Sequence, residues 1–332
     1  MPDLYPFLLQ PEFHERVWGT RDLSPIYTRP ITGDPIGEAW LTADACKVAN
    51  GPLTGLTLSA LCRRFGARLL GDMVEDTSRF PLLIKFLFPQ DKLSVQVHPD
   101  DAAARAAGQP CGKTECWYVL DAKPGSQIGL GLKPGTSKAD VERAIREKHM
   151  EQLLNWIEVR AGEVYYVDAG TVHAIGPGAV IVETQQNSDI TYRLYDYGRP
   201  RELHIGRGLL AVKEQTHAGR VIAGHPVEDR GKAQVNLITS PSFIVDKFAV
   251  KQPWQFQRPK HAVRSVWCLV ATRGCAVVEA EGAAPVTFSA GQAVVVPAAT
   301  EGFILRPQWD VEFLCSSLPV EPVEEPKTVL GS

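Results

Sequence analysis

An internal repeat constrains the fold of this chain more than any other feature of its sequence. The segment LSVQVH at 93–98 can be written over FIVDKF at 243–248, and the same offset places ECWYVL at 115–120 over SVWCLV at 265–270. A third pair, AGEVYYVDAGTVH at 161–173 and AGQAVVVPAATEG at 290–302, follows at a shorter offset, because the stretch 137–156 has no counterpart in the second copy. Three segments that agree in order indicate two related β units, one of which carries an insertion.

The repeated segments are short and rich in β-branched and aromatic residues, which is typical of strands. Many short strands bounded by turn residues predict a sandwich or barrel. Apolar residues three and four apart predict helices over 57–71 and 137–156, and a third, weaker helix after Leu203. We therefore predict a mainly β protein with two barrels and a few helices packed outside. The expected units are 1–232 with an N-terminal extension and the helical insertion, a degenerate second barrel at 233–320, and a loose polar tail at 321–332.

Charge and hydropathy exclude several classes of partner. The net charge of −3 gives no reason to expect nucleic acid or an anionic membrane as a partner. No stretch approaches the roughly 20 apolar residues of a membrane span. The N-terminus, MPDLYPFLLQPEF, has no basic region of the kind that begins a signal peptide, so we expect a cytoplasmic protein.

Four polar side chains in the first copy form a set of metal-ligand type. Gln96 and His98 are two apart in a strand, so both point to one face, which can be the barrel interior. Glu115 opens the next long strand, and His173 follows a turn. Two imidazoles and one carboxylate, completed by an amide oxygen or water, are a usual zinc set, although iron, manganese or cobalt would also fit. The second copy has different residues at all four positions: Asp246, Phe248, Ser265 and Gly302.

A histidine in a strand is, taken alone, more often a structural residue than a ligand. The spacing around His173 favours a ligand. Gly162, Asp168, Gly170 and His173 form the pattern G-x5-D-x-G-x2-H, which is similar to the second motif of cupin barrels with Asp168 where proline is usual. We therefore predict cupin-type barrels (double-stranded β-helix, jelly-roll), of which only the first holds a metal.

Longer segments resemble one family closely. LSVQVHPDD, GKTECWYVL, GTVHAIGPG and TQQNSDITYRLYDYGR are similar to type I mannose-6-phosphate isomerases in their short bacterial form. RVWGT at 16–20 and GEAWL at 37–41 resemble N-terminal motifs of that family, whereas the C-terminal third matches only in architecture. The resemblance implies a reversible interconversion of mannose 6-phosphate and fructose 6-phosphate, with one zinc ion per chain held by Gln96, His98, Glu115 and His173.

The resemblance also implies roles for further residues. Arg193 matches the active-site arginine of the family. The pocket positions match Lys113, Ser94, Glu183 and Asp189, and Trp18 lies near the rim. Aldose–ketose isomerisation moves a proton between C1 and C2 through an enediol, so it needs a base and a cationic site. Lys113, Asp189 and Glu183 are candidate bases that the sequence does not rank, whereas Arg193 is charged at any working pH and suits an anion. Ser94 could donate a hydrogen bond to the phosphate.

Two other functions compete with the isomerase. A cupin dioxygenase would need ferrous iron, but Gln96 as a ligand and the cations Lys113 and Arg193 argue against it. A non-catalytic sugar-phosphate sensor is hard to reconcile with a complete metal set. We expect a phosphosugar substrate and a monomer or weak homodimer.

Overall fold

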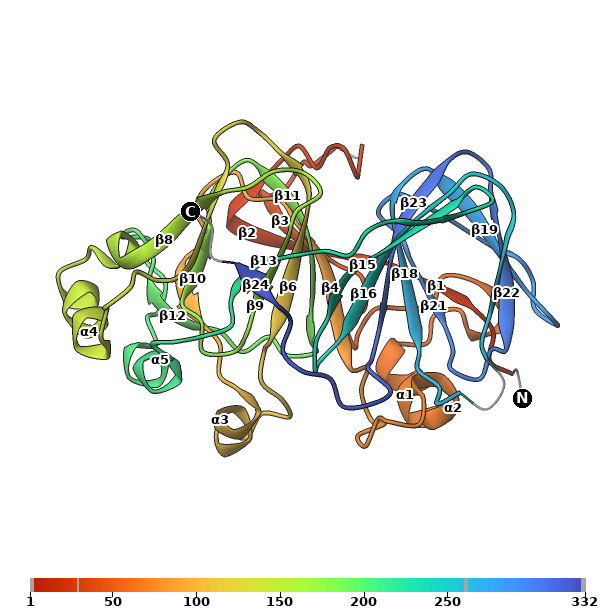
Figure 1. The fold of residues 1–332 in the computed structure, drawn as a ribbon, viewed down its shortest axis with the longest axis horizontal. Coiled ribbons are helices and arrows are strands. Elements are labelled where there is room, and N and C mark those ends of the chain that lie inside the picture. Colours follow the sequence, from red (N-terminus) through yellow and green to blue (C-terminus); the bar gives the residue numbers. More distant parts are fainter. Residues whose placement is uncertain (1–2, 29, 260–261, 330–332) are drawn as a thin grey trace.

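The computed structural model describes residues 3–28, 30–259 and 262–329, and it is built mainly from strands arranged in two halves side by side (Figure 1). Each half pairs a larger sheet with a smaller one. The fold class predicted from the sequence, a mainly β protein of two barrel-like halves, is confirmed.

The first half contains an eight-stranded and a five-stranded sheet. In spatial order the larger sheet comprises β2 (Glu12–Thr20), β3 (Ile36–Trp40), β4 (Leu82–Leu87), β11 (Ala179–Gln186), β6 (Glu115–Ala122), β9 (Val164–Val167), β13 (Gly219–Val221) and β24 (Thr328–Val329). The smaller comprises β12 (Tyr192–Tyr195), β5 (Val95–Val97), β10 (His173–Ile175), β7 (Gln127–Leu132) and β8 (Leu154–Glu158).

The second half contains a seven-stranded and a four-stranded sheet. The larger comprises β1 (Phe7–Leu9), β21 (Ala293–Val296), β18 (Trp267–Arg273), β23 (Val311–Ser317), β16 (Ile244–Val250), β15 (Lys232–Thr239) and β14 (Val227–Asp229). The smaller comprises β17 (Trp254–Gln257), β22 (Gly302–Pro307), β19 (Cys275–Ala280) and β20 (Val286–Ser289).

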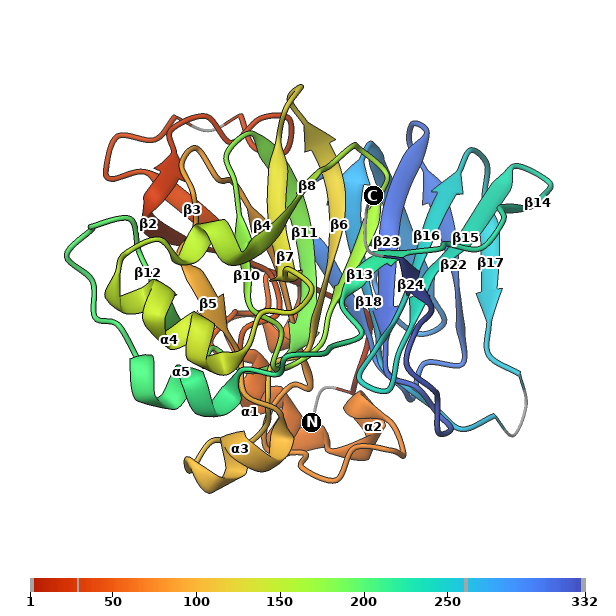
Figure 2. The ribbon, with the colours of Figure 1, turned by 60° about the vertical axis from the view of Figure 1, so that its left-hand side comes forward.

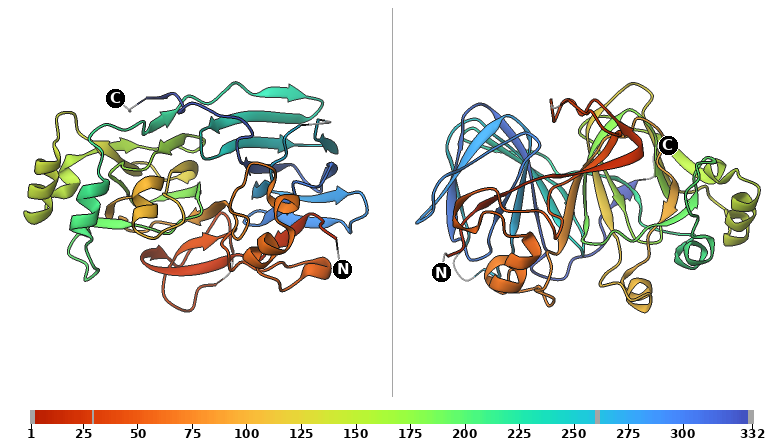
Figure 3. Two further views of the ribbon diagram at one scale, coloured as in Figure 1. Left: turned by 90° about the horizontal axis from the view of Figure 1, so that it is seen from below. Right: turned by 180° about the vertical axis from the view of Figure 1, so that it is seen from behind.

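The ends of the chain cross between the halves (Figure 3). Strand β1 pairs with β21 of the second half, although its residues fall inside the predicted first domain, 1–232, so at this end the predicted division is corrected. Strand β24 pairs with β13 of the first half, and the Tyr166 hydroxyl donates to Glu325 at 2.6 Å. The prediction of a loose tail is therefore wrong for its described part. Pairing of β24 with β13 and the hydrogen bond from buried Tyr166 hold this part against the first half. The boundary between 232 and 233 stays a prediction, although β14, which precedes it, pairs with β15 in the sheet of the second half.

The helices lie outside the barrels and differ from the prediction in extent. They are α1 (Leu58–Phe65), α2 (Ala67–Leu70), α3 (Asp101–Ala106), α4 (Lys138–Arg146) and α5 (Ile205–Ala211), with short 3-10 turns η1 (Gly51–Leu53) and η2 (Met150–Leu153). The helix predicted over 57–71 is split at Gly66, and α5 confirms the one expected after Leu203. None of the described helices is long and apolar enough to cross a membrane.

The prediction of a helix over 137–156 is wrong for the residues after Arg146. Ser137 caps α4 as expected, because its hydroxyl accepts from the Asp140 amide while the Asp140 carboxylate accepts from the Ser137 amide. The helix ends at Arg146, and Lys148 then has a positive φ of 59°. From Leu154 the chain runs as β8 alongside β7, so pairing with a neighbouring strand outweighs the local helical pattern.

The side chains of β11 alternate between the interior of the first barrel and the core between the two halves. Ile181 packs in the apolar interior of the first barrel, whereas Val182 belongs to the core between the two larger sheets. Thr184, on the same face as Val182, meets Ser316 of β23 at 3.4 Å, and Figure 2 shows β11 and β6 beside β23 and β18. The opposite face therefore turns Glu183 into the barrel, where the candidate site lies.

Candidate metal centre and active-site pocket

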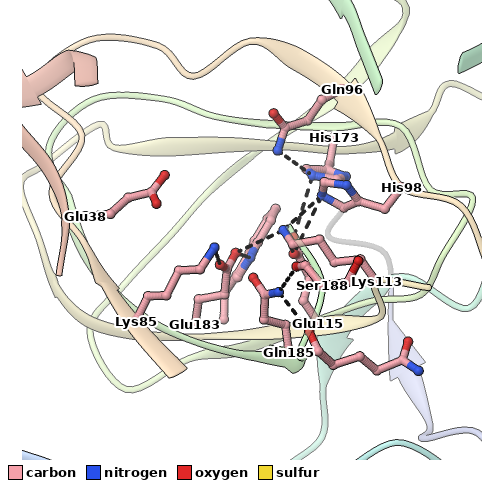
Figure 4. Close-up of polar contacts among 12 residues, drawn as sticks. Glu38, Lys85, Gln96, His98, Lys113, Glu115, His173, Glu183, Gln185 and Ser188 are labelled. Carbon is pink, nitrogen blue, oxygen red and sulfur yellow. Dashed lines mark hydrogen bonds and ion pairs between the residues drawn. The ribbon is translucent and has the colours of Figure 1, made fainter. Parts of the chain in front are cut away.

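Three buried side chains converge at one end of the first barrel (Figure 4). His98 follows β5, Glu115 opens β6 and His173 opens β10, and the register of β10 with β5 sets His173 opposite Gln96. One ligand atom from each of His98, Glu115 and His173 lies within 4.8 Å of the others, and each side chain is 1% exposed. In the described part of the chain this is the one cluster of three such residues, and it comes from strands far apart in sequence.

Backbone carbonyls orient both imidazoles. His98 Nδ1 lies 2.9 Å from the Ile190 carbonyl oxygen, and His173 Nδ1 lies 3.0 Å from that of Thr171. A carbonyl only accepts, so each Nδ1 carries the proton and each Nε2 keeps a lone pair. Those Nε2 atoms face Glu115, at 3.7 Å from Oε2 and 3.6 Å from Oε1 respectively. The local structure thus presents lone pairs, rather than N–H groups, to the carboxylate.

Glu115 provides the test of whether a metal fits. Its Oε1 is buried and has no hydrogen-bond partner among the described residues, although it faces the lone pair of His173 Nε2. A buried carboxylate oxygen without a partner is costly, and a cation between these acceptors would remove that cost. Burial and the neighbouring Glu183 raise the pKa of Glu115 to about 7, and burial, helped by Lys113, lowers the pKa of His173 to about 4. His173 is therefore neutral near pH 7, as a ligand must be.

Gln96 and Ser94 complete this side of the site. Gln96 Nε2 lies 3.2 Å from His173 Nε2, and the Ser94 hydroxyl donates to Gln96 Oε1 at 3.1 Å. The two ends of an amide are interchangeable in shape, and a hydroxyl can also accept. Turning the Gln96 amide over would point its oxygen at the centre while Ser94 accepts from the nitrogen. Ser94, predicted to contact phosphate, is thus placed beside Gln96, where it can orient the amide.

A row of alternating charges leads away from this centre. The Lys113 ammonium donates to Glu115 Oε2 at 2.5 Å, contacts His98 Nε2 at 3.1 Å, and lies 3.9 Å from Glu183 Oε1. Glu183 also pairs with Lys85 at 3.2 Å and accepts from Trp117 Nε1 at 3.2 Å. Burial opposes charge on Glu183, but Lys113 and Lys85 outweigh it and lower the pKa of this carboxyl to about 2. Burial likewise opposes charge on Lys113, yet Glu115 and Glu183 raise its pKa above the ordinary value.

A cavity of about 460 Å³ opens onto this row of charges. This size suits a small molecule. Seven of the ten predicted site residues line it: Trp18, Ser94, Gln96, Lys113, Glu183, Asp189 and Arg193. His98, Glu115 and His173 lie behind that wall, reached through Gln96 and Lys113. A larger cavity of about 660 Å³ lies against the second half and is lined by none of the predicted residues, so we assign the chemistry to the smaller one.

Arg193 lies beside the centre on β12, opposite Gln96 in the register with β5. Its Nη1 donates to the Glu202 carbonyl at 2.8 Å, and its buried Nε has no partner among the described residues. Burial and the nearby Arg201 lower the pKa of Arg193 from its usual value. Arg201 also lines the cavity, but its guanidinium donates to Asp196 at 2.6 and 2.7 Å, so the donor left for an anion on this wall is Arg193 Nε.

Five charged residues of the cavity wall were not singled out from the sequence. Lys85 could have been noticed, because it is a lysine inside the otherwise apolar run FPLLIKFLF. Glu38 is in the segment GEAWL, but no pattern marks it as charged and buried. Arg16 and Arg201 come from loops and strand edges, where the sequence does not show which side chains face inward. These five residues are Glu15, Arg16, Glu38, Lys85 and Arg201.

The second barrel is filled where the first is polar. Phe248, which corresponds to His98, stacks on Phe313 with ring centroids 5.1 Å apart in an apolar interior. Asp246 is partly buried and accepts from the Asn236 side-chain amide, so it is engaged in a local hydrogen bond. Aromatic side chains therefore fill the position in the second barrel that corresponds to His98 in the first.

Known proteins resemble this chain over most of its length. Residues 7–129 match the family model described as phosphomannose isomerase type I, catalytic domain. The mannose-6-phosphate isomerase ManA of Bacillus subtilis is 40% identical over 256 residues, which is 73% of this chain and 79% of that protein. The mannose-6-phosphate isomerase of Streptococcus mutans is 36% identical over 76% of this chain and 81% of its own length.

Solved structures give the same result. The crystal structure of the mannose 6-phosphate isomerase from Bacillus subtilis superposes with a TM-score of 0.84 at 30% identity, covering 94% of this chain and 99% of that one. A zinc-bound mannose 6-phosphate isomerase shares the fold with a TM-score of 0.72 at 16% identity. The chain, with its buried His–Glu–His cluster in the first of two β-barrels, belongs to the type I phosphomannose isomerase family.

Proposed function

We propose that this protein is a zinc-dependent isomerase that interconverts mannose 6-phosphate and fructose 6-phosphate. The observation that carries the proposal is the buried Glu115 Oε1, which has no hydrogen-bond partner among the described residues and faces an imidazole lone pair. It lies behind a cavity whose wall includes Lys113 and Arg193. The names of the relatives that this chain covers over most of their length support the substrate.

The proposed zinc ligands are His98, Glu115 and His173, with the Gln96 amide oxygen as a fourth. When bound there, the metal would supply a Lewis acid that polarises the oxygen on C1 or C2 of the open-chain sugar. The cavity beside Gln96 gives the sugar access to that position. Arg193 and Lys113 add fixed positive charge on the same wall, which would stabilise the negative charge that develops on the enediol oxygens.

The three candidate bases, Glu183, Lys113 and Asp189, differ in their surroundings. Glu183 is a weak base, because two lysines and Trp117 hold it as a carboxylate with a pKa of about 2. Lys113 remains protonated beside its two carboxylates, so it suits proton donation to a sugar oxygen. Asp189 lines the cavity, is exposed, and has no salt bridge to a lysine among the described residues. We therefore propose that Asp189 moves the proton between C1 and C2.

The direct test is an isomerase assay with the purified protein. Mannose 6-phosphate is supplied with zinc present, formation of fructose 6-phosphate is followed, and the zinc content of the purified protein is measured. Turnover with about one zinc per chain supports the proposal. Absence of turnover with zinc or cobalt bound contradicts it. Asp189→Asn should lose activity while retaining zinc, and Glu183→Gln should retain more activity than Asp189→Asn.

The expected cytoplasmic location and a monomeric or weakly dimeric state belong to the same proposal. Cell fractionation and size-exclusion chromatography at several protein concentrations test them. A tetramer or a stable dimer at low concentration would contradict the expected oligomeric state.

A further inference from the structure

Lys113 and Glu115 belong to a short segment, residues 112–115, whose backbone is hydrogen-bonded to groups outside the cavity. The backbone amides of residues 112, 113 and 114 each donate one of these hydrogen bonds. The Gly112 amide donates to Asp101 Oδ1 at 2.8 Å, and the Lys113 amide donates to the Pro99 carbonyl at 3.1 Å. The Thr114 amide donates to Gln186 Oε1 at 2.9 Å. Every peptide N–H from 112 to 114 therefore has a fixed acceptor before β6 begins.

Asp101 and Gln186 also bind each other. Gln186 Nε2 donates to Asp101 Oδ1 at 3.0 Å, so this one carboxylate oxygen accepts from both Gln186 and the Gly112 amide. The Gln186 amide in turn donates to the Thr114 carbonyl at 3.1 Å. The pair thus joins the first residue of α3, the last residue of β11 and the segment between them. A hydrogen bond that bridges three elements fixes their relative positions better than separate local bonds do.

Close backbone contact adds to this restraint. A Cβ at Gly112 would lie 2.6 Å from the carbonyl carbon of Asp100 and 2.7 Å from the amide nitrogen of Asp101. The segment therefore lies directly on the start of α3. Neither Asp101 nor Gln186 is among the residues that line the cavity, so any effect they have on substrate is transmitted through this segment.

We infer that Asp101 and Gln186 are positioning residues, which fix the backbone from which Lys113 and Glu115 reach the centre. The side chains they control make short contacts: Lys113 Nζ lies 2.5 Å from Glu115 Oε2 and 3.1 Å from His98 Nε2. Misplacement of a catalytic group by about 1 Å costs on the order of 100-fold in rate. The activity readout of this inference rests on the proposed function, whereas the zinc-affinity readout does not.

Asp100 offers a matched control in the adjacent position. Its carboxylate caps α3 by accepting from the Ala103 amide at 3.0 Å, and it pairs with Lys213 at 3.0 Å. Within the described part of the chain, the Asp100 side chain forms no hydrogen bond or ion pair with residues 112–114. Asp100→Ala therefore weakens the same helix without releasing the segment, and it separates a positioning role from general stability.

The experiment compares Asp101→Ala, Gln186→Leu, Asp101→Asn and Asp100→Ala as full-length, zinc-loaded proteins. We expect Asp101→Ala and Gln186→Leu to lower kcat by about 10- to 100-fold with KM changed less than about threefold, and to weaken zinc binding about tenfold in chelator competition. Asp101→Asn keeps an Oδ1 that accepts both donors, so it should stay within about threefold of the unaltered protein. Asp100→Ala should lower Tm but keep kcat and zinc affinity.

Two results would overturn the inference. One is near-normal kcat and zinc affinity in both Asp101→Ala and Gln186→Leu. The other is an equal loss of kcat in Asp100→Ala, which would show that α3 stability alone matters. If Asp101→Ala does not fold, Gln186→Leu and the Asn variant decide the question. If the unaltered protein has no isomerase activity, the proposed function fails and zinc affinity alone tests the positioning role.

Discussion

Replacing Lys85 by methionine removes one cation from a buried ion pair and should strongly destabilise the protein. The Lys85 ammonium lies 3.2 Å from Glu183 Oε2, and both side chains are about 5% exposed. The pKa of Glu183, about 2 against an ordinary 4.5, corresponds to about 3 kcal/mol of stabilisation of the charged form, to which Lys113 and Lys85 contribute. This agrees with the loss of about 3–5 kcal/mol that is typical when one partner of a buried pair is removed.

The pH dependence of that loss has a definite sign. A carboxyl whose folded pKa is lowered contributes stability that is fully present above its unfolded pKa and is lost as pH falls through the folded value. For Glu183 the window runs from 4.5 down to about 2. The difference in stability between Lys85→Met and the unaltered protein should therefore be full at pH 7 and shrink progressively below about pH 4.5.

Urea unfolding at pH 7 with zinc saturating measures the effect. Lys92→Met is the matched control, because Lys92 pairs with Glu151 at 2.7 Å at a partly exposed position and should cost no more than about 1 kcal/mol. The double variant Lys85→Met, Glu183→Met replaces the whole pair by apolar side chains and should lose less than the sum of the single changes. A loss for Lys85→Met no larger than for Lys92→Met, or strictly additive single changes, would refute the reasoning.

Three further predictions concern the metal and the chain end. Arg193→Ala should lower kcat by about 100-fold or more while retaining zinc, whereas His98→Ala should lose both, and an assay combined with metal analysis distinguishes them. Removing zinc with a chelator should lower Tm, because a ligand that binds only the folded state stabilises that state. The shift should reverse when zinc is restored. An unchanged Tm would contradict a metal site in the barrel. Deleting residues 323–332 should cost roughly 1–3 kcal/mol in urea unfolding, since Tyr166 loses its acceptor, and Glu325→Gln should cost less because its amide oxygen can still accept from Tyr166.

Sequence patterns were most successful where one local geometry determines the outcome. Period-2 spacing turns Gln96 and His98 toward the same side of a strand wherever that strand lies. The repeat is found by aligning the two copies in sequence, so it does not depend on any contact in the folded protein. Patterns failed where another strand decided. The residues from Leu154 to Trp156 continue a helical pattern but pair with β7, and the tail around Thr328 pairs with β13. These outcomes depend on a partner that is distant in sequence.

The mainly β fold, the repeat, and the ligand-type residues Gln96, His98, Glu115 and His173 could be predicted from sequence, because each follows from spacing along a strand or turn. Which charges surround these residues depends on how the strands pair in three dimensions. Lys85 and Glu183 lie on adjacent strands and pair only because β4 and β11 run side by side. That pairing holds Glu183 as a weak base and leaves Asp189 as the proposed proton carrier. Acidity and position of a buried group depend on neighbours in space, which no local pattern records.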